Sequence, residues 1–139
     1  MNRTRTLGIA FFSLTAALAI GVSDVHADSS GVVLAVVQQS EADGDTGRRT
    51  LQVQAPVFAG DRIITGPVGE AQVRFRDDTK LVVGPNSTLV IDAFVFADED
   101  TARQISIEAV RGAFRFIAGS SPKDAYKITT PTATIGIRG

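Results

Sequence analysis

The chain has 139 residues, with 14 Lys and Arg against 15 Asp and Glu, one His and no Cys. A balance this close to neutral gives no basic footprint for nucleic acid, so we expect no nucleic-acid partner. The absence of Cys from the sequence excludes a disulfide framework, an iron–sulfur centre and a cysteine nucleophile. The one histidine, His26, lies at the end of an apolar N-terminal segment. If that segment is removed, neither a Ser–His–Asp triad nor a histidine-ligated metal site can form.

The first 27 residues have the three-part layout of a secretory signal peptide. Arg3 and Arg5 give a positive start, an apolar run follows from Leu7 to Val22, and small or medium residues lead to Ala27. We expect cleavage between Ala27 and Asp28, which removes 27 of 139 residues and leaves 112. The alternative is a retained anchor helix. The apolar run is shorter than the roughly 20 residues that span a bilayer, which favours cleavage.

The remaining chain has the pattern of short strands separated by turns. Runs rich in Val, Ile and Phe alternate with polar residues, are bounded by Gly, Pro, Asn and Asp, and show no helical period. We predict a single all-β domain of about nine or ten short strands in stacked hairpins, β-roll or solenoid-like, or alternatively a β-sandwich. The expected strands are Gly31–Gln39, Thr50–Gln54, Arg62–Thr65, Glu70–Arg76, Lys80–Val83, Thr88–Ala97, Gln104–Val110, Ala113–Ala118, Tyr126–Thr130 and Ala133–Arg138.

Three further segments have a specific prediction. Ser40–Arg49 is rich in turn formers and is expected to be a polar loop. Thr88–Ala97 is apolar nearly all round, which predicts a central strand covered on both faces. Asp98–Asp100 is expected to be an exposed turn after that strand.

The hairpin around Asp77 and Asp78 has a predicted register. Pairing Phe75 with Leu81 keeps both on the core face and leaves a three-residue loop, Asp77–Thr79. A two-residue turn would instead set Phe75 against Lys80 and bury a charge. Such a loop needs a residue that tolerates a positive φ, which Gly adopts more readily than Asp. Replacing Asp78 by Gly is therefore expected to be neutral or stabilising.

A basic trio is the candidate partner-binding face. In the predicted register Arg74, Arg76 and Lys80 lie on the outward face of the hairpin, with Arg76 beside Lys80. They could receive an acidic protein segment or an anionic polymer. The alternative is a plain solvated strand face that discourages edge aggregation.

The acidic residues do not indicate a metal site or an active site. Glu41–Asp45 and Asp98–Asp100 could attract calcium, but the twelfth position counted from Asp43 is Gln54 and not the Glu of an EF-hand. Solvated turns are the better interpretation. Asp92, alone on an apolar strand, is expected to face a hydrogen-bonding neighbour or the sheet rim. We expect no catalytic residues, no metal, no cofactor and no enzymatic activity.

Several spaced motifs occur over positions 60 to 139. They are Gly60–Gly66, Gly69–Phe75, Asp77–Leu81, Gly84–Leu89, Gly112–Phe116, Thr130–Ala133 and Arg138–Gly139. Together, and in this order, they resemble the FecR domain, in which the position of Asp78 is usually glycine. We therefore divide the chain into a signal peptide (1–27), N-terminal strands with a polar loop (28–59) and a FecR-like domain (60–139) that is expected to be cut inside its final motif.

The resemblance implies an all-β periplasmic domain known from iron–siderophore signalling. In that system a membrane-spanning regulator senses an outer-membrane transporter and controls a cytoplasmic sigma factor. This chain has an export signal in place of a cytoplasmic segment, so direct sigma-factor control is not expected. We predict an exported protein-binding or signalling module with a protein partner in the cell envelope and no stable membrane span after cleavage. The alternative is an envelope-associated structural domain that binds cell-wall polymer such as peptidoglycan. Its expected location is the periplasm, with the extracellular space or cell surface as the alternative.

Overall fold

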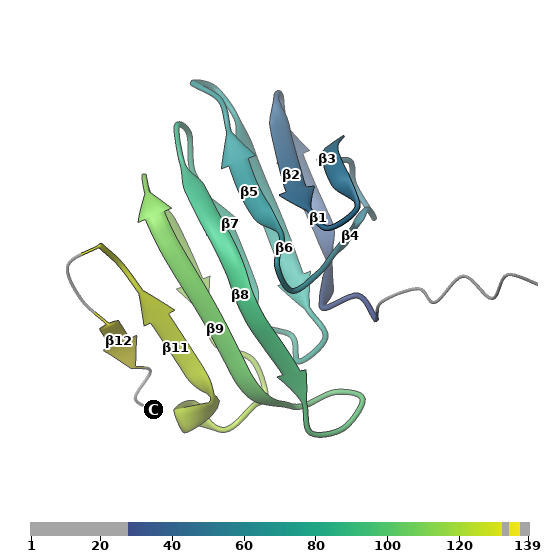
Figure 1. Ribbon diagram of the computed structural model, residues 1–139, viewed down its shortest axis with the longest axis vertical. Coiled ribbons are helices and arrows are strands. Elements are labelled where there is room, and N and C mark those ends of the chain that lie inside the picture. Colours follow the sequence, from purple (N-terminus) through teal and green to yellow (C-terminus); the bar gives the residue numbers. More distant parts are fainter. Residues whose placement is uncertain (1–27, 132–133, 137–139) are drawn as a thin grey trace, which may run out of the picture.

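The computed structural model describes residues 28–131 and 134–136, which form two open β-sheets packed face to face (Figure 1). This confirms the all-β prediction. Apart from the strands, these residues include one turn of 3₁₀ helix, η1 (Lys123–Ala125). No helix in this part of the chain has the length and hydropathy that a membrane crossing requires. The predicted leader, including Ala27 at its cleavage site, lies outside the described residues.

The two sheets differ in width. The smaller has five strands in the order β10-β7-β6-β1-β4, and the larger has seven in the order β12-β11-β9-β8-β5-β2-β3. Neighbours are antiparallel except β9 and β11, which run parallel. The smaller sheet comprises β1 (Gly31–Val37), β4 (Pro56–Val57), β6 (Glu70–Phe75), β7 (Lys80–Val83) and β10 (Phe114–Ile117). The larger comprises β2 (Ser40–Gly44), β3 (Gly47–Thr50), β5 (Arg62–Thr65), β8 (Thr88–Phe96), β9 (Ala102–Arg111), β11 (Tyr126–Thr129) and β12 (Thr134–Gly136).

The hydrophobic core lies between the sheets. Alternate residues of each strand point inward, as the period of two in the sequence requires. The rings of Phe75 and Phe94 stack across the core with centroids 5.5 Å apart. Burying such side chains is the main favourable term for a domain without disulfides. The large side chains that are fully buried here include Val33, Val57, Ile63, Val73, Phe75, Leu81, Val83, Leu89, Ile91, Ile105 and Ile107.

The segment from residue 40 to residue 54 differs from the prediction. Ser40–Arg49, expected as a polar loop, contains β2 and most of β3, which pair as a hairpin. Its inward residues, Ser40 and Ala42, are small and therefore gave no apolar signal, although both are buried. The predicted strand Thr50–Gln54 is also wrong, because β3 ends at Thr50 and Gln54 has a φ of 72° in the turn that follows.

The prediction that Thr88–Ala97 is covered on both faces is wrong as well. Only one face of β8 packs against the core, whereas Asp92 on the other face is exposed. The register of β8 against β9 shifts between Ile91 and Ala93, so that Ile91 and Phe94 both face inward. The bulge adds one residue to β8 and so changes which residues of the apolar run face the core. The run can therefore lie in a sheet that has one open face.

The β6–β7 hairpin has the predicted faces but a different register. Val73 lies opposite Leu81, and the loop is Arg76–Asp78 instead of Asp77–Thr79. The N–H of Phe75 donates to the carbonyl of Thr79 at 2.8 Å, and the N–H of Asp78 donates to the carbonyl of Phe75 at 3.0 Å. Thr79 therefore lies opposite Phe75 and is fully buried. The prediction placed this polar residue in the loop, because burial of its hydroxyl requires hydrogen-bond partners. Those partners lie far from the hairpin in the sequence, at Gly119 and Tyr126.

Asp78 has a φ of 64°, which confirms the need for a positive φ in this loop. We expect Asp78→Gly to leave the free energy of unfolding unchanged or to raise it by about 0.5 kcal/mol, because Gly adopts this conformation without a Cβ clash. Urea unfolding measures this change. The control is Asp45→Gly, also exposed and in a turn but without a positive φ, which is expected to gain nothing. A clear loss of stability in Asp78→Gly would contradict this loop geometry.

Candidate functional site

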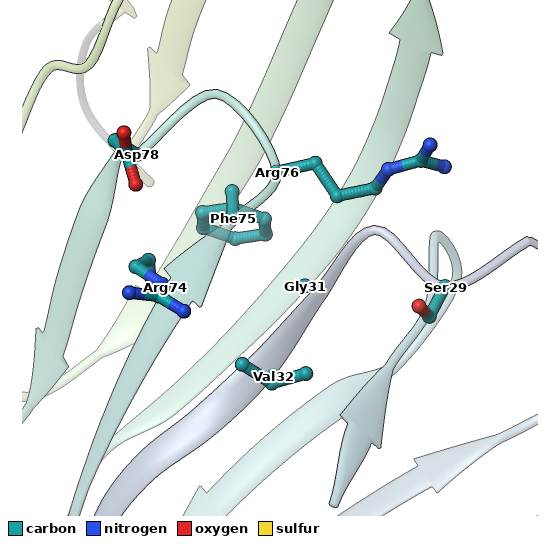
Figure 2. Close-up of a pocket in the computed structure, with 7 residues that line it drawn as sticks. All are labelled: Ser29, Gly31, Val32, Arg74, Phe75, Arg76 and Asp78. Atoms are coloured by element: carbon teal, nitrogen blue, oxygen red, sulfur yellow. The ribbon is translucent and has the colours of Figure 1, made fainter. Parts of the chain in front are cut away.

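The structure brings together two of the three predicted basic residues. Arg74 on β6 and Lys80 on β7 are directly opposite each other, and both are exposed on the outer face of the smaller sheet. Arg76 is in the loop, and Figure 2 shows its side chain extending away from Arg74. The prediction that Arg76 lies beside Lys80 is therefore wrong, because the hairpin register is shifted.

Arg76 links the two sheets. Its guanidinium carbon lies 4.2 Å from the centroid of the Phe96 ring at the end of β8. Its backbone N–H donates to the carbonyl of Ser30 at 3.0 Å. A cation over an aromatic face at an exposed site contributes about 0.5–1 kcal/mol. This arginine is thus engaged by the fold itself.

Arg115 is the third cation of the outer face and was not among the predicted basic residues. It lies on β10 opposite Val82, one strand away from Lys80, and is exposed. The alternation that places Phe114 and Phe116 on one face of their strand also puts Arg115 on the other, so the signal was present in the sequence. We call Arg74, Lys80 and Arg115 the basic face. None of them makes an ion pair among the described residues, where the recorded ion pairs involve Arg48 and Arg49.

Two shallow hollows flank Arg74 at the hairpin end of this face. One, of about 280 Å³, is shown in Figure 2 and extends from Arg74 across Val32 to Ser29. The other, of about 570 Å³, extends from Arg74 past Lys80 to Ser120. The exposed carboxylate of Asp78 lines both hollows. Cations with free donors can bind a carboxylate or a phosphate through charge-assisted hydrogen bonds. The cations of this face are therefore suited to binding anionic groups, whereas Asp78 at the hairpin end opposes such binding.

Behind the same hairpin lies a buried polar network centred on Asp77. One carboxylate oxygen, Oδ2, accepts hydrogen bonds from the hydroxyls of Ser121 and Tyr126, both at 2.7 Å. The other, Oδ1, accepts from the backbone N–H of Thr79 at 3.0 Å. The Thr79 hydroxyl donates to the Tyr126 oxygen at 3.1 Å, and the N–H of Gly119 approaches both hydroxyl oxygens. Asp77 is 1% exposed, and its bonds to Ser121 and Tyr126 join residues 44 and 49 positions apart.

The network holds Asp77 as a carboxylate. Burial alone would raise its pKa, but the hydrogen bonds from Ser121, Thr79 and Tyr126 outweigh that effect and lower it. Burial and the neighbouring negative charge of Asp77 raise the pKa of the Tyr126 hydroxyl. Because Asp77 and Tyr126 are both buried, no substrate reaches these groups. The network stabilises the fold.

The other acidic candidates are held by local partners or lie in solvent. Asp92 is exposed and accepts a hydrogen bond from the Ser106 hydroxyl at 3.2 Å, so the expected hydrogen-bonding neighbour is present. Glu41 and Asp43, both on β2, lie 3.5 and 3.7 Å from the guanidinium of Arg48. Asp98–Asp100 is an exposed turn, as expected. Within residues 28–131 and 134–136, no three His, Cys, Asp or Glu side chains are grouped as metal ligands would be.

A family model described as FecR protein matches residues 61–139. The chain belongs to the FecR family. Among solved structures, one described as a cell surface anchoring domain is similar to this chain at 25% identity and a TM-score of 0.42, over 45% of this chain and 83% of that one. A likeness at this TM-score has no bearing on function. A search of curated proteins found no match.

Within the FecR domain, several of the motif residues identified in the sequence are buried and structural. Asp61 is 2% exposed. Its carboxylate accepts hydrogen bonds from the Arg49 guanidinium at 2.6 Å and from the Phe58 N–H at 2.9 Å. The Ser87 hydroxyl accepts from the Ala113 N–H, and Gly112, with a φ of 100°, leaves no room for a Cβ against Ser87. These buried motif residues thus hold the fold, whereas Arg74, Lys80 and Arg115, which lie in the same motifs, are exposed.

We expect Asp77→Asn to lower the free energy of unfolding by about 2 kcal/mol at pH 7, because an amide has only one acceptor oxygen, and its NH2 group must then face either the Thr79 N–H or the two hydroxyls. The folded pKa of Asp77 lies below its unfolded value, so its contribution is present above that value and is lost as the pH falls through about 4 and below. The difference between the variant and the wild type should therefore shrink at pH 3. Urea unfolding at both pH values measures it.

Asp78→Asn, which changes an exposed carboxylate in the same loop, is the matched control and should be close to wild type at both pH values. An Asp77→Asn protein as stable as the wild type at pH 7 would contradict the structural role of the network.

Proposed function

We propose that this FecR-family protein is an exported module that acts in the cell envelope by binding another protein, in periplasmic signalling and not in catalysis. Membership of the family, which implies an interacting role in the envelope, is the observation that carries the proposal. The chemistry of the chain supports it. Its one histidine lies in the leader, it has no cysteine, and its most enclosed carboxylate is sequestered in the fold.

The basic face is the surface that we assign to this role. Arg74, Lys80 and Arg115 project from three adjacent strands, β6, β7 and β10, and span about 10 Å at the usual strand spacing. None of them makes an ion pair among the described residues. Exposed charges of one sign steer an oppositely charged partner and select against like-charged ones. An acidic protein surface is therefore the expected partner.

The finer proposal concerns what is sensed. Regulators of this family are known from iron–siderophore uptake, and we propose that this protein contributes to such sensing at an outer-membrane transporter. Crosslinking in cells grown with and without iron tests this link. A transporter domain captured in an iron-dependent manner supports it, and capture of unrelated envelope proteins under both conditions contradicts it.

A second candidate function is binding of an anionic cell-wall polymer. The same three cations would suit phosphate or carboxylate groups repeated along such a polymer. Sedimentation with purified peptidoglycan distinguishes the two candidates. Salt-sensitive co-sedimentation that is lost in Arg74→Glu favours the polymer.

Export predicts a defined N-terminus. Protein recovered from the envelope of expressing cells should begin at Asp28, since signal peptidase requires a small residue before the cut. Mass spectrometry of the intact protein measures this. Ala27→Arg should leave the uncleaved precursor. Ala17→Arg, which places a charge inside the apolar run, is the control that shows the effect of losing export itself. A wild-type protein that retains Met1 after export would support the anchor alternative.

Charge reversal tests the basic face. We expect Arg74→Glu with Lys80→Glu to reduce crosslinked partner at least threefold, because both attractions become repulsions. The control is Arg103→Glu, also exposed but on β9 of the other sheet. Circular dichroism melting shows whether each variant is folded. Equal loss in the control, or no loss in the double variant, would contradict the assignment of this face.

A further inference from the structure

The smaller sheet ends at a strand whose outer edge has no partner among the described residues. β10 pairs only with β7. The N–H of Gly84 donates to the carbonyl of Ala113 at 2.9 Å, which fixes the alternation of the ladder. Arg115 and Ile117 therefore direct their backbone groups toward β7, and Phe114 and Phe116 direct theirs outward. Within residues 28–131 and 134–136, no strand pairs with these outward donors and acceptors.

An apolar pocket of about 260 Å³ lies beside this edge, between the sheets. Phe114 and Phe116 of β10 form one wall, and Ile128 of β11 lies across from them. All three are half-buried, and Leu89 and Ile107 close the base. A side chain entering from the β10 edge would thus be buried among apolar groups.

The unequal width of the sheets explains the pocket. At the far end β4 lies near β3, since the Arg49 guanidinium donates to the carbonyl of Pro56 at 3.1 Å. Toward the other end, Phe75 of β6 stacks on Phe94 of β8, and the ring of Phe116 on β10 lies edge-on to that of Tyr126 on β11, with centroids 5.6 Å apart. β10 thus covers part of β11, and β12 continues the larger sheet beyond it, at its outer side in Figure 1. Among the described residues, the position next to β10 and over this overhang holds no strand.

We propose that β10 binds an extended segment of a partner protein as a sixth strand of the smaller sheet, which deepens the protein-binding function proposed above and rests on it. Such a strand hydrogen-bonds to the backbone of Phe114 and Phe116. Its two residues opposite these phenylalanines point into the apolar pocket, and the residue between them lies beside Arg115 on the outer face. The recognised segment thus has an acidic residue between two apolar residues.

A second copy of this chain does not fit the position. Pairing β10 with β10 of another copy would place the overhanging ends of both larger sheets over the same stretch of the joined sheet. It would also bring two Arg115 side chains close together, which is unfavourable. A single strand has neither conflict.

Two other edges are poorer acceptors. β4 has only two residues, beginning with Pro56, which has no N–H to donate. β3 carries Arg48 and Arg49, both engaged in ion pairs, and charged edge strands resist pairing.

Titration with synthetic peptides tests the inference on the folded protein. The probe is acetyl-Ser-Thr-Val-Glu-Val-Thr-Ser-amide, and its control, acetyl-Ser-Val-Thr-Glu-Thr-Val-Ser-amide, has the same composition with Val on the same face as Glu. We expect the probe to shift the amide NMR signals of Phe114 and Phe116 saturably, and to bind at least threefold more tightly than the control. Equal binding of both peptides, shifts confined to other strands, or no shift at millimolar peptide would overturn the proposal.

A charge swap tests the assigned role of Arg115. Arg115→Glu should weaken the probe at least threefold and bind better to a peptide with Lys in place of Glu, whereas Arg103→Glu should behave as wild type. If the swap does not change the preference between the Glu and Lys peptides, Arg115 does not recognise the acidic residue and the stated motif is wrong. Envelope crosslinking decides the proposed function separately. If wild type and Arg115→Glu capture a partner equally, the proposed protein-binding function is retained, and β10 is excluded as the binding site.

Discussion

The carboxylate of Asp77 is the constraint on which this end of the domain depends. It is buried without a cation and is held by hydrogen bonds from Ser121, Tyr126 and Thr79. Leaving any of these groups unpaired would cost about 1–3 kcal/mol, so the hairpin loop and the segment before β11 are held together. Thr79 must face inward to complete the network. That requirement sets the register in which Arg74 lies opposite Lys80, and so the buried network positions part of the basic face.

The FecR motifs contain both buried polar residues and the residues of the proposed binding surfaces. Asp61, Asp77 and Ser87 lie inside, and the bonds from Ser121 and Tyr126 to Asp77 join the β6–β7 loop to the segment that leads into β11 of the other sheet. Arg115 and the outer edge of β10 lie at the surface. The buried polar residues therefore hold the fold, whereas the proposed binding role rests on outward side chains of the same motifs.

The unequal sheets connect the two proposed surfaces. The basic face ends at β10, and the apolar pocket begins on the inner side of the same strand. A strand added to β10 would extend the basic face by one position and close the pocket at once. Backbone pairing would supply general affinity, while the pocket and Arg115 would select the sequence. Charge attraction and strand addition are in this way two parts of a single mode of recognition.

The sequence alone determined the fold class, most strands and the family, because alternation and turn residues are local signals; Arg62–Thr65 and Lys80–Val83 match β5 and β7 in full. It also indicated the positive φ at Asp78. Only the tertiary structure decided that Ser40 and Ala42 face a core, since small inward residues give no apolar pattern. It likewise decided the hairpin register and the grouping of Arg115 with Arg74 and Lys80. Those features depend on partners 30 to 50 residues away, such as Tyr126 for Asp77, and no local pattern records them.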